Sequence, residues 1–281
     1  MKFTLLVGTL NRCNELSYCI HSLLSQSYDN YEIVIVDQSD NDKTEQYVAE
    51  LNNNRIKYLH IKQKGLSHAR NEGLKAATGE YICLIDDDAY YGEDYLEIAM
   101  KSVNDKTVLS GFILNTSNNL PYVSYSEANN ERYLSKRSVI RTCPSAGLVI
   151  PRALFNDVGV FDERFGVGSE FSSGEETDVL LRGMGFGYKV MYLNSLKLEH
   201  PCPKVKDNIY TTEQKMHKRA KYLEGLGALL KKHIANLRDY SLCGIVLENE
   251  VKLIIKGIVC KNRKITFEQL KCFNRGLSHR L

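Results

Sequence analysis

An apolar run that ends in three consecutive carboxylates constrains the fold of this chain more than any other stretch. The run spans residues 81–85, and the acids are Asp86, Asp87 and Asp88. Such a run is typical of a buried parallel strand, and open α/β sheets collect ligands at the carboxyl ends of their strands. Because adjacent carboxylates repel one another, the pattern favours a bound divalent cation, Mg²⁺ or Mn²⁺, over the alternative of a solvated acidic turn.

Length and composition are those of an ordinary globular protein. The 281 residues are 43% hydrophobic and 25% charged, which allows one large domain or a domain with an appendage. No apolar run approaches the roughly 20 residues that a membrane span requires. The first residues enter a strand without the features of a secretory signal, so we expect a cytoplasmic protein. The eight cysteines include no C-x-x-C pair, and we expect reduced, mostly structural thiols rather than a zinc site.

Charge is divided unevenly along the chain. Residues 204–281 contain 17 Lys and Arg against 7 Asp and Glu, a net charge of +10, whereas residues 1–203 have a net charge of −7. A basic tail of this kind predicts contact with an anionic partner, such as a membrane surface or a phosphorylated lipid. A solvated basic helical face is the alternative. Helical periodicity is expected over 216–234, about 241–260 and about 265–275.

Hydrophobic patterning in the first part of the chain predicts strands that alternate with helices. Apolar or alternating runs predict strands at 3–7, 32–36, 55–61 and 81–85. The helix after the third strand begins at Ser67, a favourable capping residue, and ends near Gly79. The order β-α-β-α-β-α-β is typical of a mostly parallel sheet flanked by helices.

Several segments, in this order, resemble the motifs of family 2 glycosyltransferases of the GT-A fold. They are Thr9-Leu10-Asn11-Arg12, Val36-Asp37-Gln38-Ser39, Gly65 to Gly73, Asp86-Asp87-Asp88, Gly174 to Arg182, and Glu199-His200-Pro201. The resemblance covers about 200 residues. It implies a Rossmann-like GT-A catalytic domain at 1–203. The basic, helically periodic residues 204–281 are expected to form a C-terminal extension. The resemblance also implies an enzyme of bacterial polysaccharide biosynthesis, such as capsule or O-antigen assembly.

The resemblance places a nucleotide-diphosphate sugar at the strand ends. Its donor contacts are expected to be Thr9, Asn11, Arg12, Asp37, Ser39, Arg70, Asn71, Asp86 and Asp87. A carboxylate at Asp37 can accept from the imide N–H of uracil or thymine, so a UDP- or dTDP-linked donor is expected. By the same resemblance, Asp88, Asp86 and His200 hold Mn²⁺ or Mg²⁺. A lone histidine is more often a structural residue, which is the alternative for His200.

The resemblance also identifies a catalytic base. The family pattern usually reads Glu-Asp where this chain has Glu175-Glu176, so Glu176 occupies the base position with one methylene more. Glu175 and Asp178 are the alternatives. Carboxylates at a helix N-terminus are also stabilised as caps, and this structural role is expected for Glu175 more than for Glu176.

The predicted catalytic domain divides into two halves. Residues 1–114 are expected to bind the nucleotide sugar and residues 115–203 the acceptor. Tyr122, Tyr125 and Tyr133 lie in the acceptor half, where aromatic faces can stack on sugars. The segment 161–173, with its two glycines, predicts a mobile loop that closes over the donor.

The sequence therefore predicts an inverting, metal-dependent transferase that moves a sugar to a hydroxyl of a glycan or lipid-linked oligosaccharide. It is expected in the cytoplasm, in peripheral contact with the membrane, and without a nucleic-acid partner. A sugar-phosphate nucleotidyltransferase is an alternative, but it should have a glycine-rich basic loop after the first strand, and residues 8–12 are not such a loop. A non-catalytic nucleotide- or glycan-binding module is the other alternative, and it would not need both acidic motifs.

Overall fold

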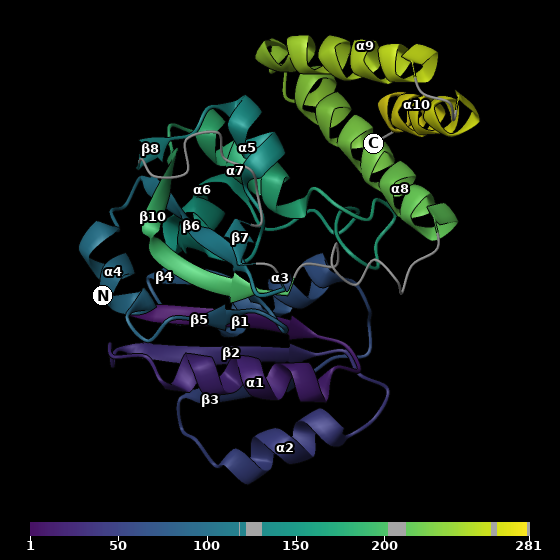
Figure 1. Ribbon diagram of the computed structural model, residues 1–281. Coiled ribbons are helices and arrows are strands. Elements are labelled where there is room, and N and C mark those ends of the chain that lie inside the picture. The colour runs from purple at the N-terminus through teal and green to yellow at the C-terminus, as the bar shows by residue number, and fades with distance from the viewer. Residues whose placement is uncertain (118, 122–130, 202–211, 260–262, 280–281) are drawn as a thin grey trace.

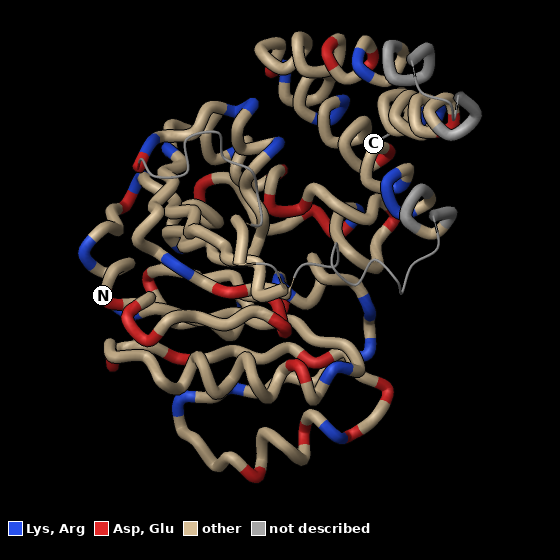
Figure 2. The backbone as a smooth tube through the Cα atoms, in the orientation of Figure 1, with Lys and Arg blue, Asp and Glu red and all other residues tan. Residues whose placement is uncertain are grey.

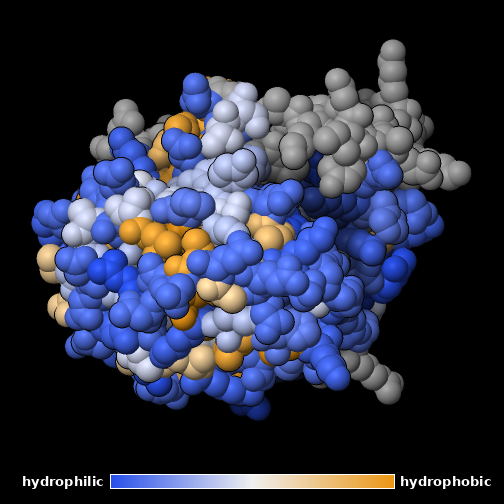
Figure 3. Space-filling model, turned by 90° about the horizontal axis from the view of Figure 1, so that it is seen from below, coloured by the Kyte–Doolittle hydropathy of each residue, from blue (hydrophilic) through white to orange (hydrophobic). Residues whose placement is uncertain are grey.

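A mixed β-sheet between two layers of helices forms the body of the molecule. The computed structural model describes residues 1–117, 119–121, 131–201, 212–259 and 263–279. Within these ranges a ten-stranded sheet lies at the centre, and the C-terminal helices form a separate group on one side of it (Figure 1). The face on which α2 (Lys43–Leu51) lies is largely hydrophilic (Figure 3).

The sheet is parallel where the acidic motifs lie and mixed elsewhere. Its order is β3-β2-β1-β4-β9-β6-β10-β5, with β7 paired to β6 and β8 paired to β10. The strands are β1 (Phe3–Thr9), β2 (Tyr31–Asp37), β3 (Ile56–His60), β4 (Tyr81–Asp86), β5 (Tyr90–Tyr91), β6 (Thr107–Asn115), β7 (Leu120–Pro121), β8 (Arg132–Tyr133), β9 (Leu148–Pro151) and β10 (Lys189–His200). Strand β1 is parallel to β2 and β4, and β2 is parallel to β3. Strand β9, which was not predicted, is antiparallel to β4 and to β6. The predicted parallel sheet is thus confirmed for its first four strands.

Helices bury apolar faces against both sides of the sheet. One side packs against α1 (Cys13–Leu24), α2 and α4 (Tyr95–Ser102), and the other against α3 (Leu66–Ala76), α5 (Lys136–Thr142), α6 (Arg152–Val158) and α7 (Glu175–Gly185). Gly73 allows α3 to approach β1 closely, because a Cβ at this position would lie 2.2 Å from Leu6 Cδ1. The glycine at the end of the third predicted motif therefore sets the distance between this helix and the sheet.

The predicted helical C-terminal extension is confirmed. It consists of α8 (Thr212–Lys231), α9 (Cys243–Val259) and α10 (Arg263–Ser278). Helices α8 and α10 cross so closely that a Cβ on Gly276 would lie 2.0 Å from the carbonyl oxygen of Glu224. The domain boundary predicted at residue 203 lies outside the described residues. No helix in the described ranges combines the length and the hydrophobicity needed to span a bilayer.

The C-terminal helices share a hydrophobic core with the rest of the molecule. Leu230 of α8 and Phe273 of α10 pack in one cluster with Leu181 of α7. A second cluster joins Leu229 of α8 to Phe165, in the loop that precedes α7. The extension is therefore bound to the elements that carry Glu175 and Glu176.

A buried ionic cluster holds the same junction together. Asp178 of α7 has no exposed surface, and its carboxylate lies 2.8 Å from Lys232 Nζ, 2.9 Å from Arg182 Nη2 and 3.0 Å from His233 Nε2. Lys232 also contacts Asp162, at 2.8 Å. Burial alone would raise the pKa of Asp178, but these partners lower it to about 2.

We predict that Asp178→Asn lowers the free energy of unfolding by about 3–5 kcal/mol, because it removes one partner of a buried ionic cluster. Glu97→Gln is the matched control, since it removes an exposed ion pair with Lys101 and should change stability little. Urea denaturation followed by circular dichroism measures both.

The effect of Asp178→Asn should also depend on pH. A carboxyl whose pKa is depressed in the folded state stabilises it above the unfolded pKa of ~3.9 and loses that contribution as the pH falls toward 2. The difference between wild type and Asp178→Asn should therefore be complete at pH 6 and shrink between pH 4 and pH 2. A constant difference across this range would contradict the role given to the carboxylate.

Candidate active site

The candidate site lies at the carboxyl ends of β1, β2 and β4. In the parallel register, Thr9 is opposite Asp37 and Gly8 is opposite Asp86. The register therefore brings the loops after three strands to one edge of the sheet. Acidic residues gather at this edge and at the start of α7, whereas basic residues lie on the part of α8 that faces them (Figure 2).

Asp87, the middle acid of the triplet, points into the protein. It is 5% exposed and accepts hydrogen bonds from Thr9 Oγ1, at 2.8 Å, and from Arg12 Nη1, at 2.7 Å. Burial raises the pKa of Asp87 to about 7, although Arg12 and Thr9 act in the opposite direction. Asp87 thus ties the loop after β1 to the loop after β4. The predicted donor contacts of these three residues stay predictions.

Asp86, Asp88 and His200, the residues predicted to hold a metal, lie next to one another, and their role as ligands stays a prediction. His200 Nε2 lies 3.2 Å from Asp88 Oδ1 and 3.5 Å from Asp86 Oδ2. Burial alone would lower the pKa of His200, but the two carboxylates raise it to about 10. For Asp88 the directions are reversed. Burial alone would raise its pKa, but hydrogen bonds from His200 and Arg12 lower it to about 2. At neutral pH an imidazolium is therefore held between two carboxylates.

The side chains of Asp86, Asp88 and His200 are chemically suitable ligands for a hard divalent cation. Two carboxylates and one imidazole are ligands that Mn²⁺ accepts and that Mg²⁺ can use in part. His200 contacts both carboxylates directly, however, and the described residues include no group of three or more His, Cys, Asp or Glu already arranged to hold a metal ion. His200 would have to lose its proton and turn away from the two carboxylates before these residues could share a cation.

The loops after β1 and β2 meet beside the triplet. Asn11 has a left-handed backbone, with φ of 57°, and its N–H donates to Ser39 Oγ at 2.7 Å. Asp37 is fully buried, and its two oxygens accept from the Ser39 N–H at 2.8 Å and from the Tyr58 hydroxyl at 2.9 Å. The structure therefore places these predicted donor residues together. Asp37 already holds two protein donors, and its contact with a nucleobase stays a prediction.

Arg70 of α3 connects the acidic triplet to the acids of α7. Its side chain is 3% exposed, and Nη1 donates to Glu175 Oε1 at 2.9 Å while Nη2 lies 3.5 Å from Asp86 Oδ1. The guanidinium lies over the Phe161 ring, 5.6 Å from its centroid. Arg70 therefore fixes the start of α7 relative to the end of β4.

Glu175 and Glu176 differ in their surroundings, although they are adjacent. Gly174, with φ of 100°, turns the chain into α7, and Glu175 is 4% exposed and paired with Arg70. Glu176 is half-buried. Burial and the adjacent charge of Glu175 raise the pKa of Glu176 well above its ordinary value, and Arg70 opposes them only in part. The pair thus consists of a buried carboxylate held by Arg70 and a carboxyl, Glu176, whose proton affinity is raised.

The loop that precedes α7 is attached to α3. Asn71 Nδ2 donates to the carbonyl oxygen of Phe161 and to Glu163, each at 3.0 Å, and Ser67 Oγ donates to the carbonyl oxygen of Phe165 at 2.5 Å. In this structure Asn71 positions the loop, and its predicted donor contact stays a prediction. The predicted closure of this loop over a donor also remains untested.

Two other predicted residue sets lie elsewhere. Asp178, an alternative base, is enclosed by the cations of the buried cluster and has no exposed surface. Of the acceptor-half tyrosines, Tyr133 lies in β8 and is 57% exposed, whereas Tyr122 and Tyr125 lie outside the described residues.

Sequence comparison relates the chain to glycosyltransferases. The family model described as "Glycosyl transferase family 2" matches residues 4–165, more than half of the chain. Glycosyltransferase GlyA of Streptococcus pneumoniae is 28% identical over 259 residues, which cover 85% of this chain and 37% of GlyA. Putative glycosyltransferase EpsH of Bacillus subtilis is 36% identical over 108 residues, which cover 38% of this chain and 31% of EpsH. The chain thus spans about a third of the length of these relatives.

Solved structures share the fold. Staphylococcus aureus TarS 1–349, in complex with UDP-GlcNAc, superposes with a TM-score of 0.60 at 18% identity, over 99% of this chain and 90% of that one. The mannosyltransferase PcManGT of Pyrobaculum calidifontis, in complex with GDP-Man and Mn²⁺, superposes with a TM-score of 0.68 at 14% identity, over 99% and 87%. These likenesses support the GT-A fold that the sequence predicted. The family model matches more than half of the chain, including the acidic loops that follow β2 and β4. The chain therefore belongs to glycosyl transferase family 2.

Proposed function

We propose that this protein transfers a sugar from a nucleotide-diphosphate donor to an acceptor hydroxyl, with inversion at the anomeric carbon. The observation that carries the proposal is the convergence at the end of β4. Asp86, Asp88 and His200 lie on one side, and Arg70 connects them to the Glu175-Glu176 pair on the other. Arg70 thereby links the proposed site of the leaving diphosphate to the pair that contains the proposed proton acceptor.

In the proposed step, the acceptor oxygen attacks the anomeric carbon as the bond from that carbon to the diphosphate oxygen breaks. Glu176 takes the proton of the attacking hydroxyl, and the diphosphate leaves with the bonding electrons. The raised pKa of Glu176 favours its carboxylate as a proton acceptor. Arg70 holds Glu175 in place, and Glu175 in turn raises the proton affinity of Glu176.

Metal dependence is part of the proposal. Asp88, Asp86 and His200 would hold Mn²⁺ or Mg²⁺, and the cation would offset the charge that develops on the departing diphosphate. The support is the chemistry of the three converging side chains, together with the Mn²⁺ named in the PcManGT complex.

The donor proposed is UDP- or dTDP-linked. Support comes from the carboxylate of Asp37 at the end of β2 and from the UDP-GlcNAc bound in TarS. A purine donor is the alternative, since PcManGT is described with GDP-Man. Near Ser39, the segments 38–42 and 60–62 line a cavity of about 330 Å³ beside the expected base position.

A role in bacterial surface-polysaccharide synthesis at the membrane is also proposed. Leu247, Val251 and Ile254 are exposed at 44–62% on one stripe of α9, within the basic C-terminal extension. Such a surface suits peripheral contact with an anionic bilayer. Sedimentation with phosphatidylglycerol vesicles at low and high salt tests it, and equal binding to neutral phosphatidylcholine vesicles would contradict it.

The two alternative functions remain distinguishable from this proposal. A sugar-phosphate nucleotidyltransferase would release pyrophosphate from a nucleoside triphosphate. A binding module would bind nucleotide without turnover.

We predict that the protein slowly hydrolyses or transfers from a UDP- or dTDP-linked sugar when Mn²⁺ is present. A panel of UDP-, dTDP- and GDP-sugars, followed by nucleotide release, identifies the donor. Chelation with EDTA should abolish turnover and Mn²⁺ should restore it, because the leaving diphosphate then regains its counterion. Turnover that is unaffected by EDTA would contradict metal dependence, and pyrophosphate release from UTP would favour the nucleotidyltransferase.

We further predict that Glu176→Gln lowers transfer by about a hundredfold or more, since it keeps the shape of the side chain and removes its basicity. Glu175→Gln is the matched comparison and should lower transfer less, while UDP affinity stays near wild type in Glu176→Gln. The wild-type rate should fall at acid pH as Glu176 takes up a proton, and Glu176→Gln should lack that dependence. Near-native transfer by Glu176→Gln would place the base elsewhere.

A further inference from the structure

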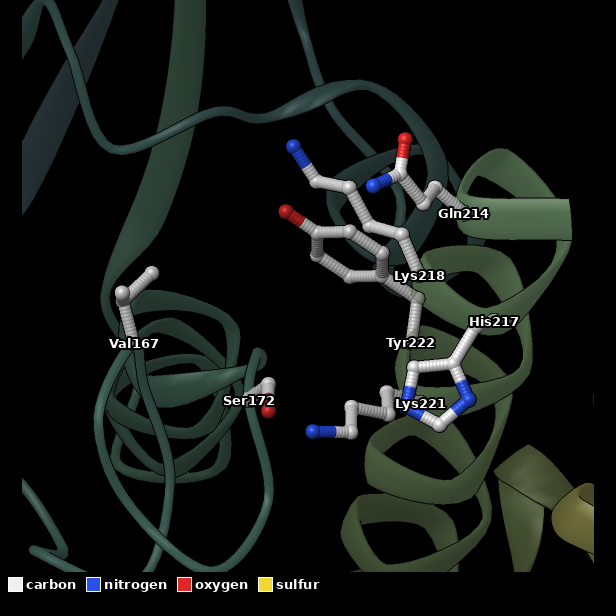
Figure 4. Close-up of a pocket in the computed structure, with 7 residues that line it drawn as sticks. All are labelled: Val167, Ser172, Gln214, His217, Lys218, Lys221 and Tyr222. Carbon is white, nitrogen blue, oxygen red and sulfur yellow. The ribbon is translucent and has the colours of Figure 1, made fainter. Parts of the chain in front are cut away.

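A pocket of about 700 Å³ lies between the loop that precedes α7 and the first half of α8. Val167 and Ser172 line it from the loop, and Gln214, His217, Lys218, Lys221 and Tyr222 line it from α8. Figure 4 shows Val167 and Ser172 on the loop, opposite the side chains of α8. Pockets of this size accommodate small ligands.

The pocket is cationic. Among the lining residues that the structure describes, two are lysines, one is a histidine and none carries a carboxylate. Within the described part of the chain, neither His217 nor Lys221 forms a salt bridge. Lys232, which follows the same helix, differs in this respect because it pairs with Asp162 and Asp178. The ammonium group of Lys221 is thus available to attract an anionic ligand.

The loop wall of the pocket lies beside the candidate catalytic acids. Val167 follows Gly166, and a Cβ on Gly166 would lie 3.3 Å from Glu175 Cδ. Burial, together with the charges of Glu175, Glu176 and Asp86, raises the pKa of Tyr222 on the helix wall. On the loop side, Ser172 precedes Glu175 by only three residues. A ligand in the pocket would therefore extend to Glu176 from the side of α8, whereas β2 and β3 lie on the opposite side of the strand ends (Figure 1).

The walls of the pocket are held at a fixed separation. Gly225 of α8 lies against the loop, and a Cβ there would be 2.7 Å from Ser173 Oγ. The neighbouring contact of Leu229 with Phe165 buries the same junction. The helix that carries the lysines of the pocket therefore contacts the loop at Gly225, one turn after Lys221.

We propose that this pocket binds a phosphate group of the acceptor and so places a neighbouring acceptor hydroxyl at Glu176. The inference rests on the proposed function. Lysines act on phosphate as point charges, whereas a planar carboxylate is matched best by the bidentate fork of arginine, and the lining residues that the structure describes include lysines and no arginine. The substrate class is therefore a phosphate-bearing acceptor rather than a neutral or carboxylate-bearing glycan.

The direct test is calorimetric titration of the full chain with glycerol 3-phosphate and with the soluble diester glycerophosphoglycerol, at low ionic strength. Lys221→Ala should weaken binding about tenfold or more, since it removes a charged partner of the phosphate. Arg219→Ala is the matched control, because it removes the same charge from the same helix outside the pocket. Glycerate should bind more weakly than glycerol 3-phosphate.

Three outcomes would overturn the proposal: equal weakening by Lys221→Ala and Arg219→Ala, equal affinity for glycerate, or a parallel loss of UDP affinity in Lys221→Ala. A parallel loss of UDP affinity would indicate that the pocket binds the diphosphate of the donor rather than the acceptor. Binding to phosphatidylglycerol vesicles without binding of the soluble diester would assign a lipid surface instead and would also contradict the proposal. The failure of the proposed function would give a different result. The protein would then neither bind UDP nor turn over a nucleotide sugar, but its phosphate binding would still depend on Lys221, so the anion site would stand without the proposed function.

Discussion

The buried guanidinium of Arg70 is the constraint on which the candidate site depends. It joins Glu175, at the start of α7, to Asp86, at the end of β4. Glu175 lies 105 residues after Arg70 in the sequence. A buried arginine requires such partners, because an unpaired charge in the interior costs several kcal/mol. The link places the proposed base beside the proposed diphosphate site. The contacts of α3 with the loop before α7 support it from the same helix.

Neighbouring acids of one type acquire different roles from their surroundings. Asp87 turns inward to Thr9 and Arg12, while Asp88 and Asp86 turn toward His200. Glu175 is paired with Arg70, and the pKa of Glu176 is raised. Farther along α7, Asp178 is paired with Lys232 and His233 of the C-terminal segment. The differences in solvation and partners, rather than the residue types, separate structural carboxylates from candidate catalytic ones.

The parallel half of the sheet was predictable because each of its strands is an apolar or alternating run followed by polar residues. Strand β9 was not, because Leu148–Pro151 is only four residues long and lies in a region of weak periodicity. The motifs marked Arg70 and Glu175 separately, but no pattern showed that they form a pair. The helical stripe of α8 was likewise visible, whereas the partners of Lys232 and the pocket at Lys221 depend on tertiary packing, which periodicity does not specify.

The central claim is that the end of β4 binds the diphosphate of a nucleotide with the help of a cation held by Asp88. Calorimetry of UDP binding with and without Mn²⁺, in wild type and in Asp88→Asn, tests it most directly. The account predicts that Mn²⁺ strengthens UDP binding to the wild type and has little effect on Asp88→Asn, while circular dichroism shows an unchanged fold. An equal effect of Mn²⁺ on UDP binding by both proteins would contradict it.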